Sequence, residues 1–502
     1  MISVQVISRF LIQQEKTISF QTENALEHKG LVTLCNKMRS MPPNVIILRD
    51  ISSSSYLIAT DIIRSIPVFY CLKDDILYIS DRTDDLLPYS SMEISDFYSQ
   101  EFLSTGYTTG DNTIIKDIKQ LQAGEYILVT YLGLKKEFYQ KYLTNHFYDF
   151  PYDSLKNKFV QILEDVFKSL ITNLGGRPAL IPLSGGYDSR LILYWLKRLK
   201  YPKVECFTYG RINNIEVENA KQVACNLNYP WRFIEYTGLN LKDYIESEDF
   251  NKYFPYMANH SSMFYMQEYF AIKYLKDNSL ITSESTFIPG HSGDFIAGSH
   301  LFSGLRHQLT IRKIAKIIYQ KHFQLINNNS KDMFIPTIEN ELDRGLYHSH
   351  LIYEDWDMRE RQAKFIVNSA RIYSFFGYNY LLPFYDHRFI DFFKAIPFEY
   401  KLYKKLYSDV LKSLFADYEL NFKNEIQPKA SDYRFHHFKQ GLIDKLPFLN
   451  KYKKLPLNDT HCYQEITDVM KTELKNKNKK IIKPFSYNGY IVQWYLNSIN
   501  KE

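Results

Sequence analysis

A short glycine-rich turn between a strand and a helix limits the fold of this chain more than any other feature. An apolar segment at residues 179–183 predicts a buried strand, and residues 190–200 predict a helix that ends before Pro202. A second strand follows at residues 204–209, so the whole stretch predicts a βαβ unit. The turn itself consists of Ser184, Gly185, Gly186, Tyr187, Asp188 and Ser189.

The same alternation continues after this unit. One face of the next predicted helix carries apolar residues from Ile215 to Leu227, and residues 231–236 predict a further strand. Strands that alternate with helices predict a doubly wound parallel sheet. Beyond about residue 301, amphipathic segments separated by prolines predict a mostly helical part.

The first 150 residues have a different pattern. Short apolar stretches separated by polar turns predict strands and an all-β or sandwich-like region, and helical spacing of apolar residues begins near residue 152. A domain boundary is therefore expected at about residue 150, which gives domains 1–150 and 151–502. The predicted strands cover residues 44–49, 56–60, 68–72, 76–80 and 126–130.

The chemistry of the turn at residues 184–189 points to a phosphate site. Backbone N–H groups and a helix N-terminus converge there on anionic oxygen, while the serine hydroxyls add donors. Asp188 is placed to hold the magnesium that neutralises a pyrophosphate leaving group. No Gly-Lys-Ser/Thr follows, so this is not the Walker motif. A plain tight turn with a serine cap is the alternative, and the βαβ context favours the phosphate site.

Composition narrows the class of protein. The 502 residues carry a net charge of +6 with 62 basic and 56 acidic side chains. The basic residues are scattered and do not form a stripe, so the sequence does not predict nucleic acid as a partner. The lysines of residues 475–483 are interpreted as a solvated helix end or loop. Five scattered cysteines, a poor signal-peptide pattern and no long apolar run predict a cytoplasmic protein without membrane insertion.

The turn, read as SGGxDS after a strand, resembles the PP-loop of the ATP pyrophosphatases, and its surroundings resemble the asparagine synthetase branch of that family. Leu382 to Asp386 resembles the family's "PFLD" segment, and Ile396, Pro397 and Lys401 resemble the pattern that follows it. The resemblance implies an α/β protein. Its N-terminal domain would be β-rich with an Ntn-hydrolase-like αββα arrangement, and would correspond to a degenerate glutamine-amidotransferase-like domain. A doubly wound parallel-sheet PP-loop synthetase domain with a mostly helical C-terminal part would follow.

The resemblance also implies site residues. ATP would be bound by Ser184, Gly185, Gly186, Asp188, Ser189 and Gly290, with Mg²⁺ on Asp188 and Asp294. His291 and Lys429 would be catalytic, the first as a base for the incoming amine and the second as a charge that stabilises the acyl transition state. Three alternatives stay open: Asp294 as a helix cap, His291 as a structural residue and Lys429 as an ordinary surface lysine.

Departures from the family pattern bear on the reaction. A glutaminase of this family uses a cysteine after the initiator Met, whereas residue 2 is Ile, so glutamine hydrolysis is predicted to be absent. His291 stands where glutamine-dependent relatives carry a catalytic glutamate, and Phe295 replaces the Glu after the loop aspartate. Both changes put aspartate in doubt as the substrate.

The expected function is therefore that of an asparagine synthase-like ligase that uses ATP and Mg²⁺ to adenylylate a small-molecule carboxylate and joins it to ammonia or an amine. Surface-polysaccharide or peptide and secondary-metabolite modification are the expected settings, and a homodimer is left open. Ammonia-dependent asparagine synthesis is the first alternative. A degenerate scaffold is the second, and a PP-loop tRNA-modifying enzyme is disfavoured because the chain shows no basic surface or cysteine pair.

A dense polar stripe lies upstream of the Leu382 to Asp386 segment. A structural ion-pair network is the favoured interpretation of this stripe. It comprises Arg359, Glu360, Arg361, Asn368 and Arg371.

Overall fold

A parallel five-stranded sheet forms the centre of the region after residue 150. The structure is a computed structural model that describes residues 2–18, 25–38, 41–326, 330–422 and 459–499. All neighbouring strands in this sheet are parallel. Their order is β12 (Trp231–Glu235), β11 (Val204–Gly210), β10 (Ala179–Pro182), β13 (Thr286–Phe287) and β14 (Asn379–Tyr380).

The direction of winding reverses between β10 and β13. The next two strands along the chain, β11 and β12, lie on one side of β10, and the later strands β13 and β14 lie on the other. In sheets of this kind the loops after two such strands diverge and leave a crevice at their carboxyl ends, where ligands bind. The predicted parallel sheet is confirmed, and its topology marks the end of β10 as the place to look for a site.

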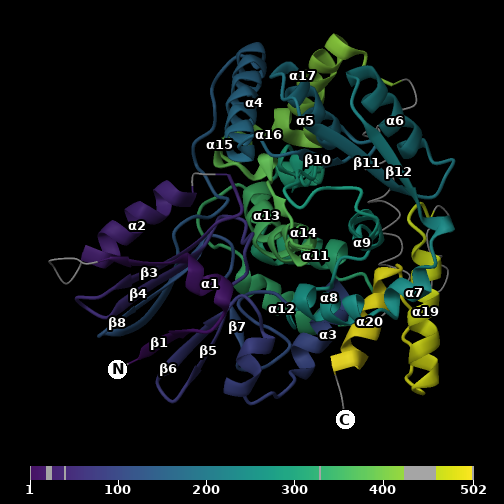
Figure 1. Cartoon of the computed structure of the whole chain (residues 1–502). Helices are drawn as coiled ribbons and strands as arrows, with labels where there is room; N and C mark the ends of the chain where they lie inside the picture. The colour runs from purple at the N-terminus through teal and green to yellow at the C-terminus, as the bar shows by residue number, and fades with distance from the viewer. Residues whose placement is uncertain (1, 19–24, 39–40, 327–329, 423–458, 500–502) are drawn as a thin grey trace.

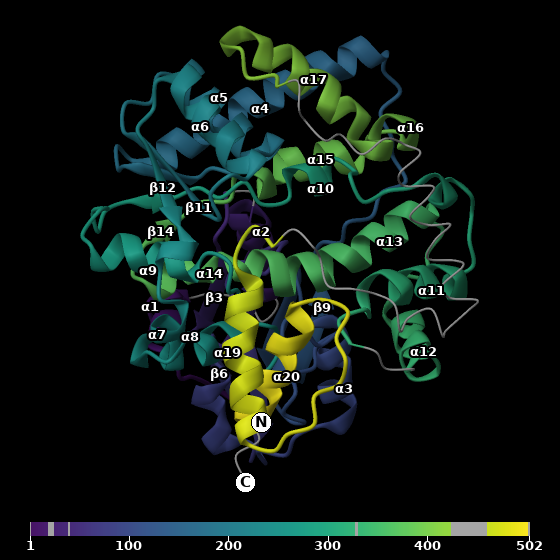
Figure 2. The same cartoon turned by 90° about the vertical axis from the view of Figure 1, so that its right-hand side faces the viewer.

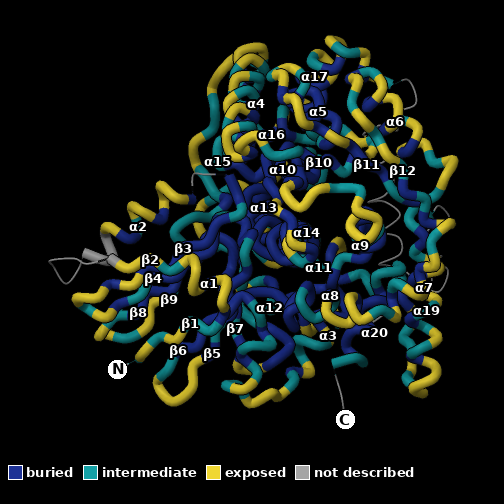
Figure 3. Tube along the Cα trace, viewed as in Figure 1, coloured by how far each residue is buried: buried dark blue, intermediate teal, exposed yellow. Residues whose placement is uncertain are grey.

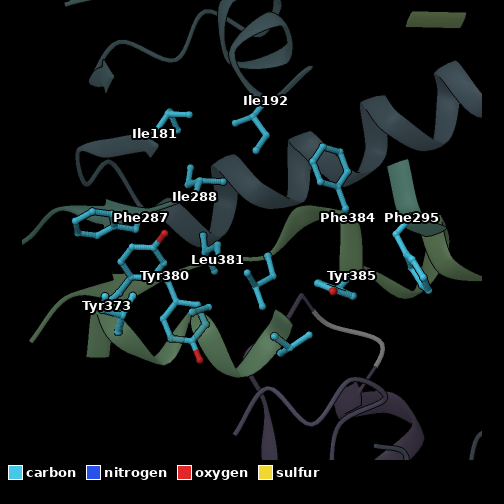
Figure 4. Close-up of a cluster of buried hydrophobic side chains, with 14 of the residues drawn as sticks. Ile181, Ile192, Phe287, Ile288, Phe295, Tyr373, Tyr380, Leu381, Phe384 and Tyr385 are labelled. Atoms are coloured by element: carbon cyan, nitrogen blue, oxygen red, sulfur yellow. The ribbon is translucent and has the colours of Figure 1, made fainter. Parts of the chain in front are cut away.

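Helices cover both faces of this sheet, as Figures 1 and 2 show. On one face α5 contributes Ile192, while on the other α14 contributes Tyr373, whose ring stacks on Phe287 at 4.3 Å (Figure 4). The covering helices include α4 (Tyr152–Leu174), α5 (Tyr187–Arg198), α6 (Ile215–Leu227), α9 (Tyr269–Asp277) and α14 (Arg371–Phe375).

Two further sheets, formed by residues before 139, pack face to face. Their shared core includes Ile47, Ile58 and Ile127 from one sheet and Leu77 and Ile79 from the other. One sheet has the order β1 (Ser3–Val6), β6 (Ile76–Ser80), β5 (Phe69–Lys73) and β7 (Lys119–Gln120). The second has the order β2 (Glu15–Ile18), β3 (Val45–Asp50), β4 (Ser55–Thr60), β8 (Glu125–Thr130) and β9 (Gly133–Phe138).

The five predicted strands of this region are confirmed, but the all-β interpretation is wrong because helices α1 (Arg9–Gln14), α2 (Ala25–Met38) and α3 (Asp96–Thr105) belong to it. Helix α3 has clear end signals, since Ser95 caps its first turn and Gly106 ends it at φ 86°. Helix α2 packs Leu34 and Met38 on the outer face of the second sheet. An Ntn-hydrolase-like αββα arrangement remains a prediction.

The region after residue 301 is mostly helical, as predicted. Figure 3 shows buried residues gathered around β10, α10 (Gly293–Ile296) and α13 (Ser349–Asp357), with exposed residues on outward helices such as α2 and α6. None of the helices in the described ranges is both long and apolar enough to cross a membrane. The remaining helices are α7 (Leu241–Ile245), α8 (Glu248–Ala258), α10 (Gly293–Ile296), α11 (Ile311–His322), α12 (Lys331–Glu341), α13 (Ser349–Asp357), the π-helix Met358–Val367, α15 (His387–Lys394), α16 (Phe398–Lys401), α17 (Lys405–Phe415), α19 (Tyr463–Asn476) and α20 (Asn488–Ile499).

Candidate functional site

The glycine-rich turn joins β10 to α5 and folds back on itself through its two serines. The Ser184 N–H donates to Ser189 Oγ at 3.2 Å, the two hydroxyl oxygens lie 3.1 Å apart, and the Gly186 N–H donates to Ser184 Oγ at 3.3 Å. Ser184 and Gly186 are exposed. The first turn of α5 therefore begins beside an open glycine loop, which is the geometry of a helix N-terminus that can receive phosphate oxygens.

Gly185 lets this turn lie directly against α6. A Cβ atom on Gly185 would stand 3.0 Å from Glu216 Cα and 3.3 Å from Asn219 Cβ, closer than side chains normally pack. Only a glycine therefore allows the turn to approach the start of α6 this closely. The glycine that the sequence marks as a site residue thus also has a packing role.

A second loop, which follows β13, crosses the glycine turn in close contact. A Cβ atom on Gly290 would lie 2.6 Å from the Ser189 nitrogen, and one on Gly293 would lie 2.9 Å from Asp188 Cγ. Because β10 and β13 are adjacent and parallel, their following loops leave the same edge of the sheet. The structure thus brings together the two loops that the sequence singles out, although more than a hundred residues separate them.

Asp188 is the electrostatic centre of this contact. Its Oδ2 accepts the Asp294 N–H at 3.0 Å, and its Oδ1 accepts the Tyr407 hydroxyl at 2.7 Å. Burial, and then the like charge of Asp294, raise the pKa of Asp188 to about 7, although both hydrogen bonds and the Lys404 ammonium act in the opposite direction. Lys404 Nζ lies 3.9 Å from Asp294 Oδ2. The acid pair lacks enough positive charge nearby to keep Asp188 fully ionised.

This charge deficit fits a divalent cation. Within the described ranges, no group of three or more His, Cys, Asp or Glu side chains could hold a metal ion by itself. Mg²⁺ does not need such a cage, since it commonly uses one or two carboxylates together with waters and substrate phosphates. Asp188 and Asp294 beside an open phosphate-type turn therefore match the ligand set for magnesium on a polyphosphate.

His291 lies in the second loop and is neutral at neutral pH. Burial lowers its pKa to about 4, and its Nδ1 atom has no hydrogen-bond partner among the described residues. The next residue, Ser292, donates to Gln362 Oε1 at 2.6 Å and accepts the Tyr385 hydroxyl at 2.7 Å. A neutral imidazole can accept a proton, but a pKa of about 4 makes His291 a weaker base than an unperturbed histidine.

Tyr407, Lys404 and Gln362 are residues that the sequence did not single out. Tyr407 lies 219 positions from the carboxylate that it contacts, and no local motif marks either residue of that pair as a partner of the other. Lys404 immediately precedes α17 and has a left-handed backbone conformation (φ 52°). The sequence did not predict this conformation, which only the structure shows. Lys429 lies outside the described residues, so its predicted role stays a prediction.

The segment from Leu382 to Asp386 has a divided role. Asp386 caps α15 and accepts two hydrogen bonds of 2.8 Å from the Arg388 guanidinium. Tyr385 instead faces the second loop, and Figure 4 shows it on the same side of the core as Phe295. The segment thus anchors a helix and places one hydroxyl beside the site.

Comparisons with known proteins give limited likenesses. No protein-family description matches the chain. A stretch of 59 residues aligns with a 7-cyano-7-deazaguanine synthase of Parabacteroides distasonis at 37% identity. The alignment covers 11% of this chain and 26% of that protein. An NH3-dependent NAD synthetase from Campylobacter jejuni, solved with nitrate, aligns with 42% of this chain and 94% of its own at 17% identity and a TM-score of 0.22. A TM-score this low does not establish a common fold.

Proposed function

We propose that this protein is an ATP-dependent, AMP-forming amide ligase of the asparagine synthase type. The observation that carries the proposal is the Asp188–Asp294 pair, which lies against an exposed glycine turn at the point where the winding of the sheet reverses. The local likeness to a synthase supports it. The division into a degenerate amidotransferase-like domain, 1–150, and an ATP-pyrophosphatase domain, 151–502, is part of the same proposal.

Each residue of the two loops has a role in this scheme. Ser184, Gly185, Gly186, Ser189 and Gly290 would contact the triphosphate of ATP through backbone N–H groups and hydroxyls. Asp188 and Asp294 would hold Mg²⁺, which supplies positive charge to the pyrophosphate leaving group. The Tyr407 hydroxyl orients Asp188, and Lys404 adds a fixed charge on the Asp294 side.

The reaction would proceed in two displacements. A carboxylate oxygen attacks the α-phosphorus of ATP, and the bond to pyrophosphate breaks, which leaves an acyl-adenylate. The nitrogen of ammonia or of an amine then attacks the acyl carbon, AMP departs, and the nitrogen loses a proton to a base. His291 is our candidate for that base and Lys429 for the charge that stabilises the oxyanion.

Free ammonia or a substrate amine, and not glutamine, is the proposed nitrogen donor. A glutaminase needs a thiol that ionises readily. Residue 2, where that cysteine would stand, is Ile, and burial of Cys71 in strand β5 raises the pKa of its thiol to about 11. Asparagine formation from aspartate and ammonia is a narrower form of the same chemistry.

Product analysis tests the proposal. Purified protein with ATP, Mg²⁺ and a panel of carboxylates should release AMP and pyrophosphate when ammonium or an amine is present, and glutamine should not replace them. Asp188→Asn should reduce the rate at least about 100-fold, since it removes one magnesium ligand. Asp332→Asn, the same change on the exposed side of α12, should leave the rate unaltered.

Two results would contradict this scheme. Release of ADP and phosphate would indicate attack at the γ-phosphorus. Binding of ATP without turnover of any carboxylate would indicate that the protein has kept the fold as a scaffold and lost catalysis.

A further inference from the structure

The polar stripe upstream of Leu382 is only partly the ion-pair network predicted from the sequence. Arg359 Nε donates to Asp355 Oδ2 at 3.0 Å, and Lys364 Nζ donates to Glu360 Oε2 at 2.5 Å. Asn368 and Arg371 donate to backbone carbonyls at 2.9 and 3.2 Å. These four members are therefore fixed by partners.

Arg361 is different from the other members of the stripe. Within the described part of the chain it makes no hydrogen bond and no ion pair, although its neighbours Glu360 and Gln362 are buried. It lies on the π-helix Met358–Val367, a rare geometry that is often found at functional sites. A guanidinium that the protein leaves without a partner is available to a ligand, and its planar fork matches carboxylate or phosphate oxygens.

The groups around Arg361 include a second unsatisfied charge. Asp357, one turn earlier, has a side chain that is only 1% exposed, and neither of its oxygens has a hydrogen-bond partner in the described ranges. His322 Nε2 lies 3.3 Å from Asp357 Oδ2, but burial lowers the pKa of His322 to about 4 and keeps it neutral at neutral pH. Lys321 donates to the Tyr353 hydroxyl at 2.7 Å.

These charges do not cancel. Glu354 is balanced by Lys401 at 2.7 Å, so among the described residues Asp357 is the carboxylate that remains near Lys321 and Arg361, whose charges both lower its pKa. One positive charge is therefore in excess in a largely buried cluster, where an uncompensated charge is unfavourable. An anion bound at Arg361 would restore the balance.

The cluster borders the proposed adenylylation site. Gln362, directly after Arg361, accepts the Ser292 hydroxyl of the second loop at 2.6 Å. Tyr385 donates to the same Ser292 hydroxyl at 2.7 Å. The charges of Arg361, Asp357 and Asp188 all influence the pKa of the Tyr385 hydroxyl, so these groups lie near it. A molecule held at Arg361 would thus lie beside the loop that carries Asp294.

We propose that Arg361, assisted by Lys321, is the specificity-determining receptor for an anionic group of the substrate, so that the substrate carries a carboxylate or phosphate group in addition to the carboxylate that is activated. This inference rests on the proposed function for the identity of the neighbouring site. The receptor itself is defined by a guanidinium that has no partner among the described residues and by the excess of positive charge around it.

Calorimetric titration of the full-length protein with succinate, and separately with inorganic phosphate, tests the receptor. Both titrations are made with Mg²⁺ and α,β-methylene-ATP present. Arg361→Gln should weaken binding of the preferred anion at least about tenfold, which is what the loss of one charge-assisted contact would cause. Arg361→Lys keeps the charge without the fork and should restore part of the affinity. Which of the two anions responds tells a second carboxylate from a phosphate.

Two control variants separate this inference from the proposed function. Arg312→Gln, on α11, removes an equal charge from a surface pair with Glu339 of α12, and this variant should bind the anion like the unmodified protein. Asp188→Asn should weaken the nucleotide and leave the anion unaffected. If the nucleotide fails to bind while anion binding still depends on Arg361, the receptor stands and the ligase proposal fails.

Three results would overturn the receptor. Neither anion binds the unmodified protein, or Arg361→Gln binds both as tightly as the unmodified protein does. Alternatively, Arg361→Gln weakens the nucleotide as much as the anion, which would place Arg361 in the triphosphate site. Arg361→Lys guards against a folding defect in the glutamine variant, because it must then show the same ranking of anions with intermediate affinity.

Discussion

At the scale of single residues, Asp188 makes the candidate site sensitive to pH. Its pKa, raised to about 7, means that the carboxylate is ionised above that pH and protonated below it. Because only the ionised form attracts a cation, affinity for Mg²⁺ with α,β-methylene-ATP should rise as the pH increases from 6 to 8. Titration calorimetry across this range measures the change.

The nucleotide has its own ionisation, so the comparison with Asp188→Asn is essential. The asparagine side chain cannot titrate, and any pH dependence that remains in this variant belongs to the ligand. Identical pH profiles for the two proteins would show that Asp188 does not titrate in this range. A profile that falls with rising pH would contradict the predicted sign.

At the scale of elements, the site depends on the close approach of the loops after β10 and β13. Gly290→Ala would place a Cβ atom 2.6 Å from the Ser189 nitrogen, so the loops must separate. We expect a loss of about 1–3 kcal/mol of stability, as for other overpacked positions, together with loss of nucleotide binding. Gly238→Ala, whose Cβ would meet no atom of the described residues within 4 Å, should change stability by less than about 0.5 kcal/mol. Denaturant unfolding and nucleotide titration of both variants distinguish the cases, and a fully active Gly290→Ala would contradict this account of the loop contact.

At the scale of the whole molecule, a buried ion pair joins the N-terminal region to the helical part. Lys364 Nζ donates to the Thr108 and Gly110 carbonyls at 2.9 and 2.6 Å, and Glu360 accepts the Gly110 N–H at 3.1 Å. Lys364→Met would leave the Glu360 charge buried and unpaired. The variant should lose about 3–5 kcal/mol of stability, and the contact between the two regions should loosen.

The control is Arg312→Gln at the surface, which should lose less than about 1 kcal/mol of stability. Thermal unfolding with limited proteolysis checks both, and equal melting temperatures would show that the pair does not stabilise the contact.

Local patterns in the sequence predicted much of this architecture. The βαβ unit around residues 184–189 follows from a short apolar strand, a glycine turn and a periodic helix, because each of these signals is encoded within about ten residues. The helix α2, by contrast, was not predicted. Its burial depends on an outer sheet face assembled from distant strands, which local periodicity does not reveal.

The sequence by itself determined the parallel sheet and the glycine turn with Asp188, since these depend on residue types at fixed local spacing, whereas Asp294 was expected from the resemblance to the PP-loop family. Only the tertiary structure decided that Tyr407 and Lys404 face the aspartates and that burial leaves His291 neutral. It also decided that one arginine of a uniform polar stripe has no partner among the residues that the structure describes. Such properties arise from contacts between residues far apart along the chain. The pKa of a side chain and the pairing of a charge are set by those contacts and not by the neighbouring residues in the sequence.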